Sequence, residues 1–504
     1  MRLSDGVRRQ LPELALLGLI VLLAAWLRLD ELALCEFKFD EAIAINLSTP
    51  IVDGMDWPKV GLVSSVEVNN PPLMMYLLAL PLLFSSEPVF VTGFVGLLSV
   101  VAIGLCYPLL RRRFGALVAL GTAALWAASP WSVLYARKIW GQSLLALFVV
   151  VLLHVLLVVV ERRKSWHVVW APILLGTLGQ LHLSAIAMIP VLGIVLVARG
   201  RQIRWTAFGV GVLVALGMLY PYFHHQLTHD WEDLKLAASV AKRTEDHERT
   251  SPLRPLSLTL NLLGSSGFDF VTGPSDNAFT RAAPITRKVA DAATTATSVI
   301  FGLGFLGAVI RLARTTRWKR AFPFAEVDPD EARRGIAWLW IAALWGFFLT
   351  VPLKIFPHYF IIAYPAPYIV TLLLLRDLGD LVPARLARPR AIAVAALVTL
   401  VVVAFVSFDV HFRRFIKENR GTDGDYGAVY ADKSRAVRFA LDNDLELTGG
   451  PPELGLLLEL RWRNSPPQSP PKGLMEVGDR HRGGAPACPP DQRREFGAIV
   501  GCLR

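Results

Sequence analysis

Charged residues are scarce in this sequence. Of its 504 residues, 18% are charged and 54% are hydrophobic, and the mean hydropathy is +0.46. An average soluble domain has about 25% charged and roughly 45–50% apolar residues. The apolar residues also occur in long blocks, many near the roughly 20 residues that a spanning helix needs. This pattern excludes an ordinary soluble domain and predicts an all-α polytopic membrane protein.

Cysteine is equally scarce, with four in the whole chain. Cys35 and Cys106 lack the spacing of metal ligands, so the sequence gives no sign of a cysteine-held metal. Cys488 and Cys502 can pair if the end of the chain is extracytoplasmic, although their spacing alone is a weak signal. The sequence also lacks a repeat of the solenoid type, which excludes that class of architecture.

Acidic residues are fewer than basic ones, and the formal net charge is +11. Most of the excess Lys and Arg lies in short loops between apolar blocks, where positive charge orients a membrane protein, so we expect no nucleic-acid partner. Arg2, Arg8 and Arg9 precede the first apolar run, Leu14–Leu29, and place the N-terminus in the cytoplasm. This run lacks a small-residue cleavage site, so we expect a retained helix.

The apolar blocks predict about 11 transmembrane helices, with a range of 11–13. Leu73–Phe84 is too short to span and predicts a helix on the membrane surface. The Val168–Ala198 block is broken at Gln180-Leu181-His182 and predicts two short helices that meet outside. The predicted spans are Leu14–Leu29, Val89–Leu110, Ala116–Ser129, Gln142–Val160, the two halves of Val168–Ala198, Thr206–Phe223, Thr297–Ile310, Ile336–Val351, Tyr359–Leu375 and Ala391–Phe408.

These spans imply two parts. Residues 1–408 form a membrane domain with two large extracytoplasmic loops, 30–71 and 224–295. Residues 409–504 form a polar, extracytoplasmic C-terminal tail that is partly disordered. Within this tail, Tyr426–Leu447 predicts a small strand–helix unit, and the proline-rich stretch Ser465–Pro490 predicts mostly disorder.

The predicted membrane interior has few ionisable residues, and His154 is the exception. A transporter more often places such groups near the bilayer midplane. A site at the outer surface instead suits a lipid-linked substrate whose head group projects from the leaflet. The ionisable residues at predicted outer helix ends are Asp40, Glu41, Arg137, Lys138, His182, His224, His225, Lys354 and His358.

The adjacent carboxylates Asp40 and Glu41 follow the first predicted helix. A carboxylate can take a proton from an acceptor hydroxyl or amine as that group attacks an anomeric carbon. Such a displacement also needs fixed cations to stabilise the departing phosphate, which Arg137-Lys138 and the Lys354 to His358 segment can supply. The alternative is that the two carboxylates only solvate a loop, and that the cations are anchors at the membrane surface.

The histidine spacing is only weak evidence for a metal site. His224, His225, His229 and Asp230 are close in sequence, but their spacing is not that of a known metal site, and interfacial histidines are the alternative. His182 lies at a predicted helix break and is a candidate for substrate binding. The sequence predicts no firm cofactor and leaves a divalent cation open.

Several short motifs occur in an order that resembles a known group of enzymes. They are Phe39-Asp40-Glu41-Ala42, Asn70-Pro71-Pro72-Leu73, Arg111-Arg112-Arg113-Phe114-Gly115, Ser129-Pro130 followed by Ala136-Arg137, and His358-Tyr359-Phe360-Ile361-Ile362-Ala363-Tyr364-Pro365. Over residues 10 to 375 the chain is similar to the membrane glycosyltransferases of the GT-C fold, glycosyltransferase family 39. That group includes protein O-mannosyltransferases and aminoarabinose transferases.

The resemblance implies roles for single residues. Asp40 would be the catalytic base, with Glu41 orienting the loop or the acceptor. Arg137, Lys138, His358 and Tyr359 would face the lipid phosphate, and the loop from His224 would close over the site.

Two further substrate-binding candidates depart from the family pattern. Asn70 stands where relatives often have Lys or His before Pro-Pro, and Gln142 where many have Asp.

The expected activity follows from this resemblance. A sugar would pass from a polyprenyl-phosphate-linked donor to a lipid, glycan or protein acceptor on the outer side of the cytoplasmic membrane, with membrane lipids as further partners. Two other classes stay open. A lipid or solute transporter or flippase predicts polar residues at the midplane and inverted repeats, and a scaffold predicts that Asp40 and Glu41 are freely replaceable.

Overall fold

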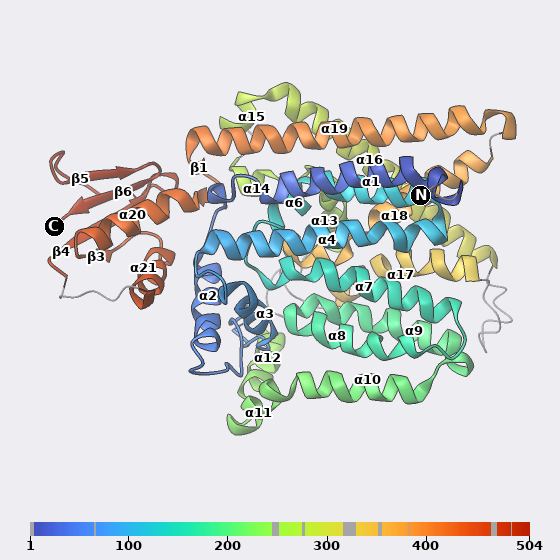
Figure 1. Cartoon of the computed structure of the whole chain (residues 1–504), viewed down its shortest axis with the longest axis horizontal. Helices are drawn as coiled ribbons and strands as arrows, with labels where there is room; N and C mark the ends of the chain where they lie inside the picture. The colour runs from blue at the N-terminus through green and yellow to red at the C-terminus, as the bar shows by residue number, and fades with distance from the viewer. Residues whose placement is uncertain are drawn as a thin grey trace.

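The computed structural model describes residues 5–64, 67–243, 251–274, 278–315, 329–350, 355–381, 383–464, 471–484 and 486–504. Long helices lie side by side along its longest axis, and a small domain with a β-sheet lies at one end (Figure 1). The helices before that domain are Asp5–Leu29 (α1), Phe39–Val52 (α2), Leu73–Leu82 (α3), Pro88–Phe114 (α4), Ala116–Ala128 (α5), Pro130–Tyr135 (α6), Gly141–Glu161 (α7), Trp170–Leu181 (α8), Ile189–Arg199 (α9), Trp205–Met218 (α10), Tyr220–Thr228 (α11), Glu232–Arg243 (α12), Arg254–Leu262 (α13), Asp269–Thr272 (α14), Ala278–Ala282 (α15), Pro284–Thr315 (α16), Pro329–Thr350 (α17), Ala366–Asp380 (α18) and Ala387–Asn419 (α19).

Length and composition make this a multi-pass membrane protein. Among the described residues, 6 helices are long and apolar enough to cross a bilayer, and up to 8 segments qualify if each bent pair is one span. The bent pairs are α10 with α11, at 52°, and Pro357–Ala363 with α18, at 54°. The predicted count of about 11 spans is not reproduced by this criterion and stays a prediction.

Two local predictions are confirmed. The stretch after Pro72 forms the short helix α3, of 10 residues, and the next stretch forms α4, of 27 residues. The Val168–Ala198 block breaks where expected, because α8 ends at Leu181 and His182 has extended backbone angles. The predicted spans Ala116–Ser129 and Gln142–Val160 match α5 and α7 to within one residue. Helices α1, α16, α17 and α19 extend 7 to 13 residues beyond the predicted spans at one end, and the predicted spans Thr206–Phe223 and Tyr359–Leu375 correspond to the two bent pairs.

Local sequence explains the bounds of α4. Pro88 stands in its first turn, where the missing N–H costs nothing, and Gly115 ends it at a φ of 87°, which favours glycine. Three arginines in its last turn complement the negative end of the helix dipole. Two of them bind acids of other helices, since Arg111 pairs with Glu13 of α1 and Arg113 with Glu161 of α7. These pairs tie three long helices together at one end.

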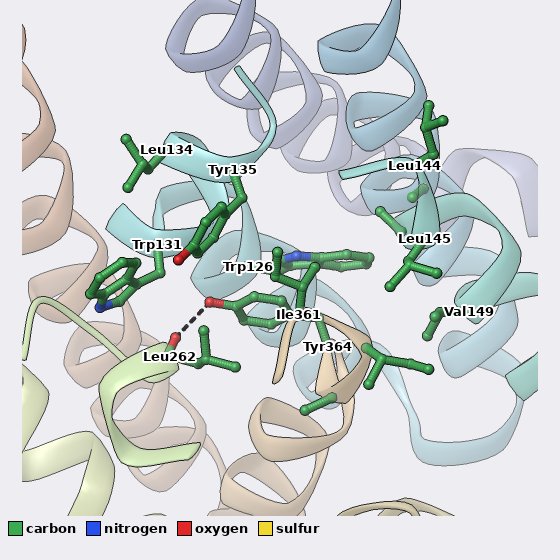
Figure 2. Close-up of a cluster of buried hydrophobic side chains, with 14 of the residues drawn as sticks. Trp126, Trp131, Leu134, Tyr135, Leu144, Leu145, Val149, Leu262, Ile361 and Tyr364 are labelled. Atoms are coloured by element: carbon green, nitrogen blue, oxygen red, sulfur yellow. Dashed lines mark hydrogen bonds between the residues drawn. The ribbon is translucent and has the colours of Figure 1, made fainter. Parts of the chain in front are cut away.

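A buried aromatic cluster joins the helices near the middle of the chain to the segment before α18 (Figure 2). The rings of Trp126 and Tyr364 stack with centroids 5.9 Å apart, and those of Trp131 and Tyr135 stack at 5.6 Å. The Tyr364 hydroxyl donates to the carbonyl oxygen of Leu262 at the end of α13, at 2.8 Å. The indole Nε1–H of Trp131 also donates to the carbonyl oxygen of Ser266 at 2.9 Å, which fixes α6 against the segment after α13.

The C-terminal domain, residues 420–504, holds a four-stranded sheet of order β3-β4-β6-β5. Strands β3 and β4 are parallel, and the other two pairings are antiparallel. Its elements are Gly421–Thr422 (β1), Gly427–Ala428 (β2), Tyr430–Asp442 (α20), Leu445–Thr448 (β3), Glu453–Asn464 (α21), Gly473–Asp479 (β4), Arg493–Phe496 (β5) and Ile499–Leu503 (β6).

This domain corrects one expectation and confirms two. The disorder predicted for Ser465–Pro490 is wrong for residues 473–479, which form β4, paired on both edges; residues 465–470 and 485 lie outside the described part. The strand–helix unit predicted within Tyr426–Leu447 is present as α20 and β3. Cys488 and Cys502 form a disulfide, as their position in the tail suggested.

The end of the bundle next to the C-terminal domain carries the first large loop. There α2 runs across the direction of the long helices, and α3 lies close by (Figure 1). Helix α19 continues past Phe408 to Asn419 and leads directly into the C-terminal domain. The two ends of the described chain lie toward opposite ends of the long axis (Figure 1).

Close helix packing yields a first testable prediction. A Cβ at Gly211 of α10 would lie 2.2 Å from the carbonyl oxygen of Val169, whereas a Cβ at Gly209 would meet nothing within 4 Å. We expect Gly211→Ala to lower the free energy of unfolding by about 1–3 kcal/mol through overpacking. Gly209→Ala is the matched control and should be neutral or slightly stabilising. Thermal unfolding in detergent measures both, and equal midpoints would contradict the packing described for α10.

Candidate functional site

Asp40 and Glu41 occupy the first turn of α2 but face different surroundings. Asp40 is exposed, whereas Glu41 is completely buried. Lys38 caps the helix, and the turn before it is tight, since Phe37 has a φ of 44°. The local sequence thus directs one carboxylate outward and the other into the protein.

Glu41 joins two separate parts of the chain. One of its carboxylate oxygens accepts the backbone N–H of Lys38 at 2.7 Å, which satisfies a backbone donor at the start of α2. The other accepts the backbone N–H of Ile139 at 2.8 Å, in the loop between α6 and α7. Both contacts are to backbone, so Glu41 positions the two loops and is not free to contact a substrate.

The environment of Glu41 changes its acidity. Burial, with help from the nearby charge of Glu36, raises its pKa to about 7, and the two backbone hydrogen bonds oppose this shift. The carboxyl group therefore holds its proton in the folded protein at a pH where an exposed Glu is ionised.

Glu36 connects the two lysines next to Asp40. It is buried and pairs with Lys138 through one oxygen, and with Lys38 at 3.2 Å through the other. Asp425 of the C-terminal domain makes a second ion pair with Lys38. Two ammonium groups are therefore held in place by acids from two domains, at the entrance of α2.

Asp40 lies within the electrostatic reach of both lysines. Neighbouring protein atoms partly desolvate its carboxyl group and raise its pKa, and the charges of Lys38 and Lys138 limit the rise. An exposed carboxylate with a raised pKa is a better proton acceptor than an ordinary Asp, and the two cations next to it suit a developing negative charge.

Arg137 contacts helix α1. Its guanidinium donates to the carbonyl oxygens of Asp30, at 2.6 Å, and Glu31, at 2.9 Å, just after α1 ends. The guanidinium therefore ties the loop between α6 and α7 to the turn that follows α1, where the Glu31 carbonyl also accepts the backbone N–H of Leu34. In this structure the donors of Arg137 point at backbone, and its role toward a lipid phosphate stays a prediction.

Aromatic and histidine rings surround Lys138. Its ammonium group lies 4.3 Å from the ring centroid of Trp140 and 5.5 Å from that of Tyr135. The ring of His358 lies edge-on to Trp140 at 5.1 Å. His182 contacts Tyr359 at 5.0 Å between centroids. The structure thus brings together Lys138, His182, His358 and Tyr359, four candidates from three distant parts of the sequence.

The remaining candidates have different surroundings or lie outside the described residues. The side-chain amide of Asn70 donates to the carbonyl oxygen of Leu62 at 2.8 Å, and its own carbonyl accepts from Gly61, so Asn70 shapes the first large loop. Gln142 is half-buried in the first turn of α7. Lys354 lies outside the described residues.

The structure describes no metal centre. His225 and His229 stack on each other, with centroids 3.9 Å apart, one turn apart in and after α11. In the described part of the chain, no group of three or more His, Cys, Asp and Glu side chains is arranged to hold a metal ion. A divalent cation therefore has no candidate site on these residues.

A small cavity reaches the ion pair of Glu36 and Lys138. Three further charged residues line it. Arg137 comes from the loop after α6, and Asp409 and Arg413 come from α19. Its other lining is apolar, including Phe268 and Phe412. The cavity is thus mostly apolar, and its charged lining includes Glu36 and Lys138 of the candidate site.

The helical bundle has the GT-C fold, the fold class indicated by the sequence motifs. Among solved structures, the chain is similar to ArnT from Cupriavidus metallidurans in the apo state, with a TM-score of 0.56, 15% identity and 97% of each chain covered. It is also similar to the same protein bound to undecaprenyl phosphate, with a TM-score of 0.53, 16% identity and 97% of each chain covered.

A third likeness is weaker. An oligosaccharyltransferase from Archaeoglobus fulgidus aligns with 85% of this chain and 55% of its own, at 14% identity and a TM-score of 0.47, which is too low to carry a conclusion. No protein-family model and no curated protein matches the sequence.

Sequence reasoning missed three residues of the site. Glu36 and Lys38 flank the Asp40-Glu41 pair, and their positions beside it were the available signal. Asp425 is 387 residues from Lys38 in the chain, and no sequence signal connects the two.

The raised pKa of Glu41 generates a prediction for stability. The folded protein holds a proton on Glu41 up to about pH 7, whereas the unfolded chain releases it near 4.5. Folding therefore takes up a proton between these pH values, and the free energy of unfolding falls as pH rises, by up to about 1.4 kcal/mol per unit. Glu41→Gln lacks this uptake. Unfolding measured in detergent from pH 4.5 to 8 should show the wild type losing stability relative to the variant, and parallel curves would contradict the buried carboxyl.

Proposed function

We propose that this protein is an integral membrane glycosyltransferase that moves a sugar from a polyprenyl-phosphate-linked donor to an acceptor on the extracytoplasmic face. The observation that carries the proposal is the exposed Asp40 beside two fixed lysines, at the end of a GT-C bundle. The structure of ArnT bound to undecaprenyl phosphate supports a polyprenyl phosphate as the lipid part of the donor.

The chemistry follows from the groups at the site. Asp40 takes the proton of an acceptor hydroxyl or amine while that group forms a bond to the anomeric carbon. The bond between this carbon and the phosphate oxygen breaks, and its electron pair leaves with the polyprenyl phosphate. Lys38 and Lys138 stabilise the departing phosphate through fixed charge. The acceptor can be a lipid, a glycan or a protein.

The disulfide between Cys488 and Cys502 supports the extracytoplasmic face, since disulfides persist in oxidising compartments. The basic N-terminal segment supports the same face. The positive-inside rule favours a cytoplasmic N-terminus, and the residues that follow the first span are then extracytoplasmic. Both observations support an extracytoplasmic position for the C-terminal domain and Asp40.

The alternative class is a polytopic transporter or flippase for lipids or solutes. It would not need a proton acceptor at the surface, and replacing Asp40 would leave transport intact. The two classes therefore separate on the fate of the lipid: a transferase releases polyprenyl phosphate, and a flippase moves the donor unchanged.

Turnover of a panel of polyprenyl-phosphate sugars by purified protein in lipid tests the proposal. We expect wild type to release polyprenyl phosphate, and Asp40→Asn to reduce the rate by about 10²–10⁴-fold, the usual contribution of a general base. Asp53→Asn, at the exposed C-terminal end of the same helix, is the matched control and should keep the rate. Equal background from all three proteins would contradict a transferase.

The pH profile of the same reaction is a separate test of Asp40. A base acts only when deprotonated, and partial desolvation raises the pKa of Asp40 above its ordinary 3.8. The rate should therefore rise with pH through a value above 3.8, and this acidic limb should be absent from the residual activity of Asp40→Asn. The same limb in both proteins would remove Asp40 from the role of base.

Orientation is testable by labelling. Lys59 in the first large loop and Arg163 in the loop after α7 are both exposed. A membrane-impermeant maleimide should label Lys59→Cys in intact cells, and Arg163→Cys only after the membrane is opened. The native cysteines Cys35 and Cys106 are buried and should stay unlabelled. The reverse pattern would place Asp40 on the cytoplasmic side.

A further inference from the structure

The segment of residues 34–38, which leads into α2, is held by the C-terminal domain. Its backbone carbonyls accept hydrogen bonds one after another from that domain. The Tyr426 hydroxyl donates to Leu34 at 2.5 Å, and the backbone N–H of Tyr430 donates to Cys35 at 2.7 Å. Four successive carbonyls, from Leu34 to Phe37, are bound in this way once Lys433 is included.

Lys433 binds the last two of these carbonyls. Its ammonium group donates to the carbonyl oxygens of Glu36, at 2.9 Å, and Phe37, at 2.7 Å. It also pairs with Glu453 at the start of α21, at 2.7 Å. Two of the three donors of the ammonium group thus meet backbone carbonyls, and the Glu453 carboxylate balances its charge.

The surroundings make this lysine unusual. The side chains of Lys433 and Glu453 are 1% and 3% exposed. Burying such a pair costs several kcal/mol in desolvation, and a well-packed apolar pair is often as stable, so global stability alone gives little reason for it. An apolar side chain, however, cannot donate to the carbonyls of Glu36 and Phe37, and these would be buried without partners.

The bound carbonyls shape the turn that directs Asp40. Phe37 has a φ of 44°, a conformation that a non-glycine residue keeps only when its surroundings impose it, and its ring packs edge-on against Tyr430 at 5.3 Å. Lys38 caps α2 directly after it, and Asp40 stands in the first turn. A change in this turn changes the direction in which the Asp40 carboxylate points.

We propose that Lys433 is a positioning residue, which holds segment 34–38 so that Asp40 and the Glu36-bridged lysines keep their mutual geometry. The proposal rests on the function proposed above, and it makes the C-terminal domain part of the site although it contributes no base. Lys433 acts through backbone, at a distance from the reacting atoms.

The test compares three variants in lipid. Lys433→Met with Glu453→Gln removes the donor without leaving a buried charge. Glu453→Gln alone keeps the two donations to Glu36 and Phe37. Lys472→Met is the matched control, because Lys472 belongs to the same domain and pairs with Asp444 on its surface. Each is measured for kcat and KM with a polyprenyl-phosphate sugar, and for amide hydrogen exchange in residues 34–42.

We expect the double variant to lose about 10- to 100-fold in kcat, the usual effect of misplacing a reacting group by about 1 Å, with a much smaller change in KM. Its amides in residues 34–42 should exchange at least about tenfold faster, as local opening becomes easier. Glu453→Gln should keep most of the activity, and Lys472→Met all of it. An unchanged kcat in the double variant, with or without faster exchange, would overturn the proposal.

Amide hydrogen exchange also distinguishes a failure of this proposal from a failure of the proposed function. If wild type turns over no sugar donor, the glycosyltransferase proposal fails, and exchange in residues 34–42 alone decides whether Lys433 holds the segment. The double variant has a folding defect if the amides of the whole C-terminal sheet lose protection from exchange. In that case Lys433→Arg tests the positioning role instead, because arginine keeps the positive charge and the hydrogen-bond donors. Recovery of at least about tenfold in kcat supports positioning, and no recovery in a folded Lys433→Arg protein overturns it.

Discussion

The hydrogen bonds of Glu41 are the constraint on which the site depends. One buried carboxyl group accepts a backbone N–H from its own helix and another from Ile139, beyond α6. It thereby sets the distance between Asp40 and the loop that carries Lys138. A glutamate suits this task because each of its two oxygens can accept a separate backbone N–H. Glu41 therefore points inward, and of the two adjacent acids only Asp40 faces outward.

The charges of the site are shared between two domains. Lys38 and Lys138 meet on Glu36, which comes from the first loop, and Asp425 of the C-terminal domain holds Lys38 from the other side. Paired in this way, the lysines keep fixed positions, which electrostatic catalysis requires. In the proposed reaction, an incoming phosphate would compete with these carboxylates for the same ammonium groups.

Much of the architecture was predictable from sequence. The apolar blocks indicate the helices, since a bilayer imposes their length and composition, and the break at His182 and the shortness of α3 follow from local pattern. The ends of α4 follow from Pro88 and Gly115. The strand β4 was not predictable, because a proline-rich, polar stretch resembles disorder, and the pairing of β4 with β3 and β6 supplies what its own sequence lacks.

The sequence by itself determined the class of the fold, the pair Asp40-Glu41, and the gathering of ionisable groups at one end of the bundle. The tertiary structure alone decided the roles within that pair, because burial of Glu41 and exposure of Asp40 depend on what packs against α2. It also decided that Arg137 binds the carbonyls after α1, and that Asp425 and Lys433 reach residues 34–38 from almost 400 positions away. Hydrogen bonds and ion pairs act over a few ångströms in space. Contacts between residues almost 400 positions apart therefore cannot be inferred from their positions in the sequence.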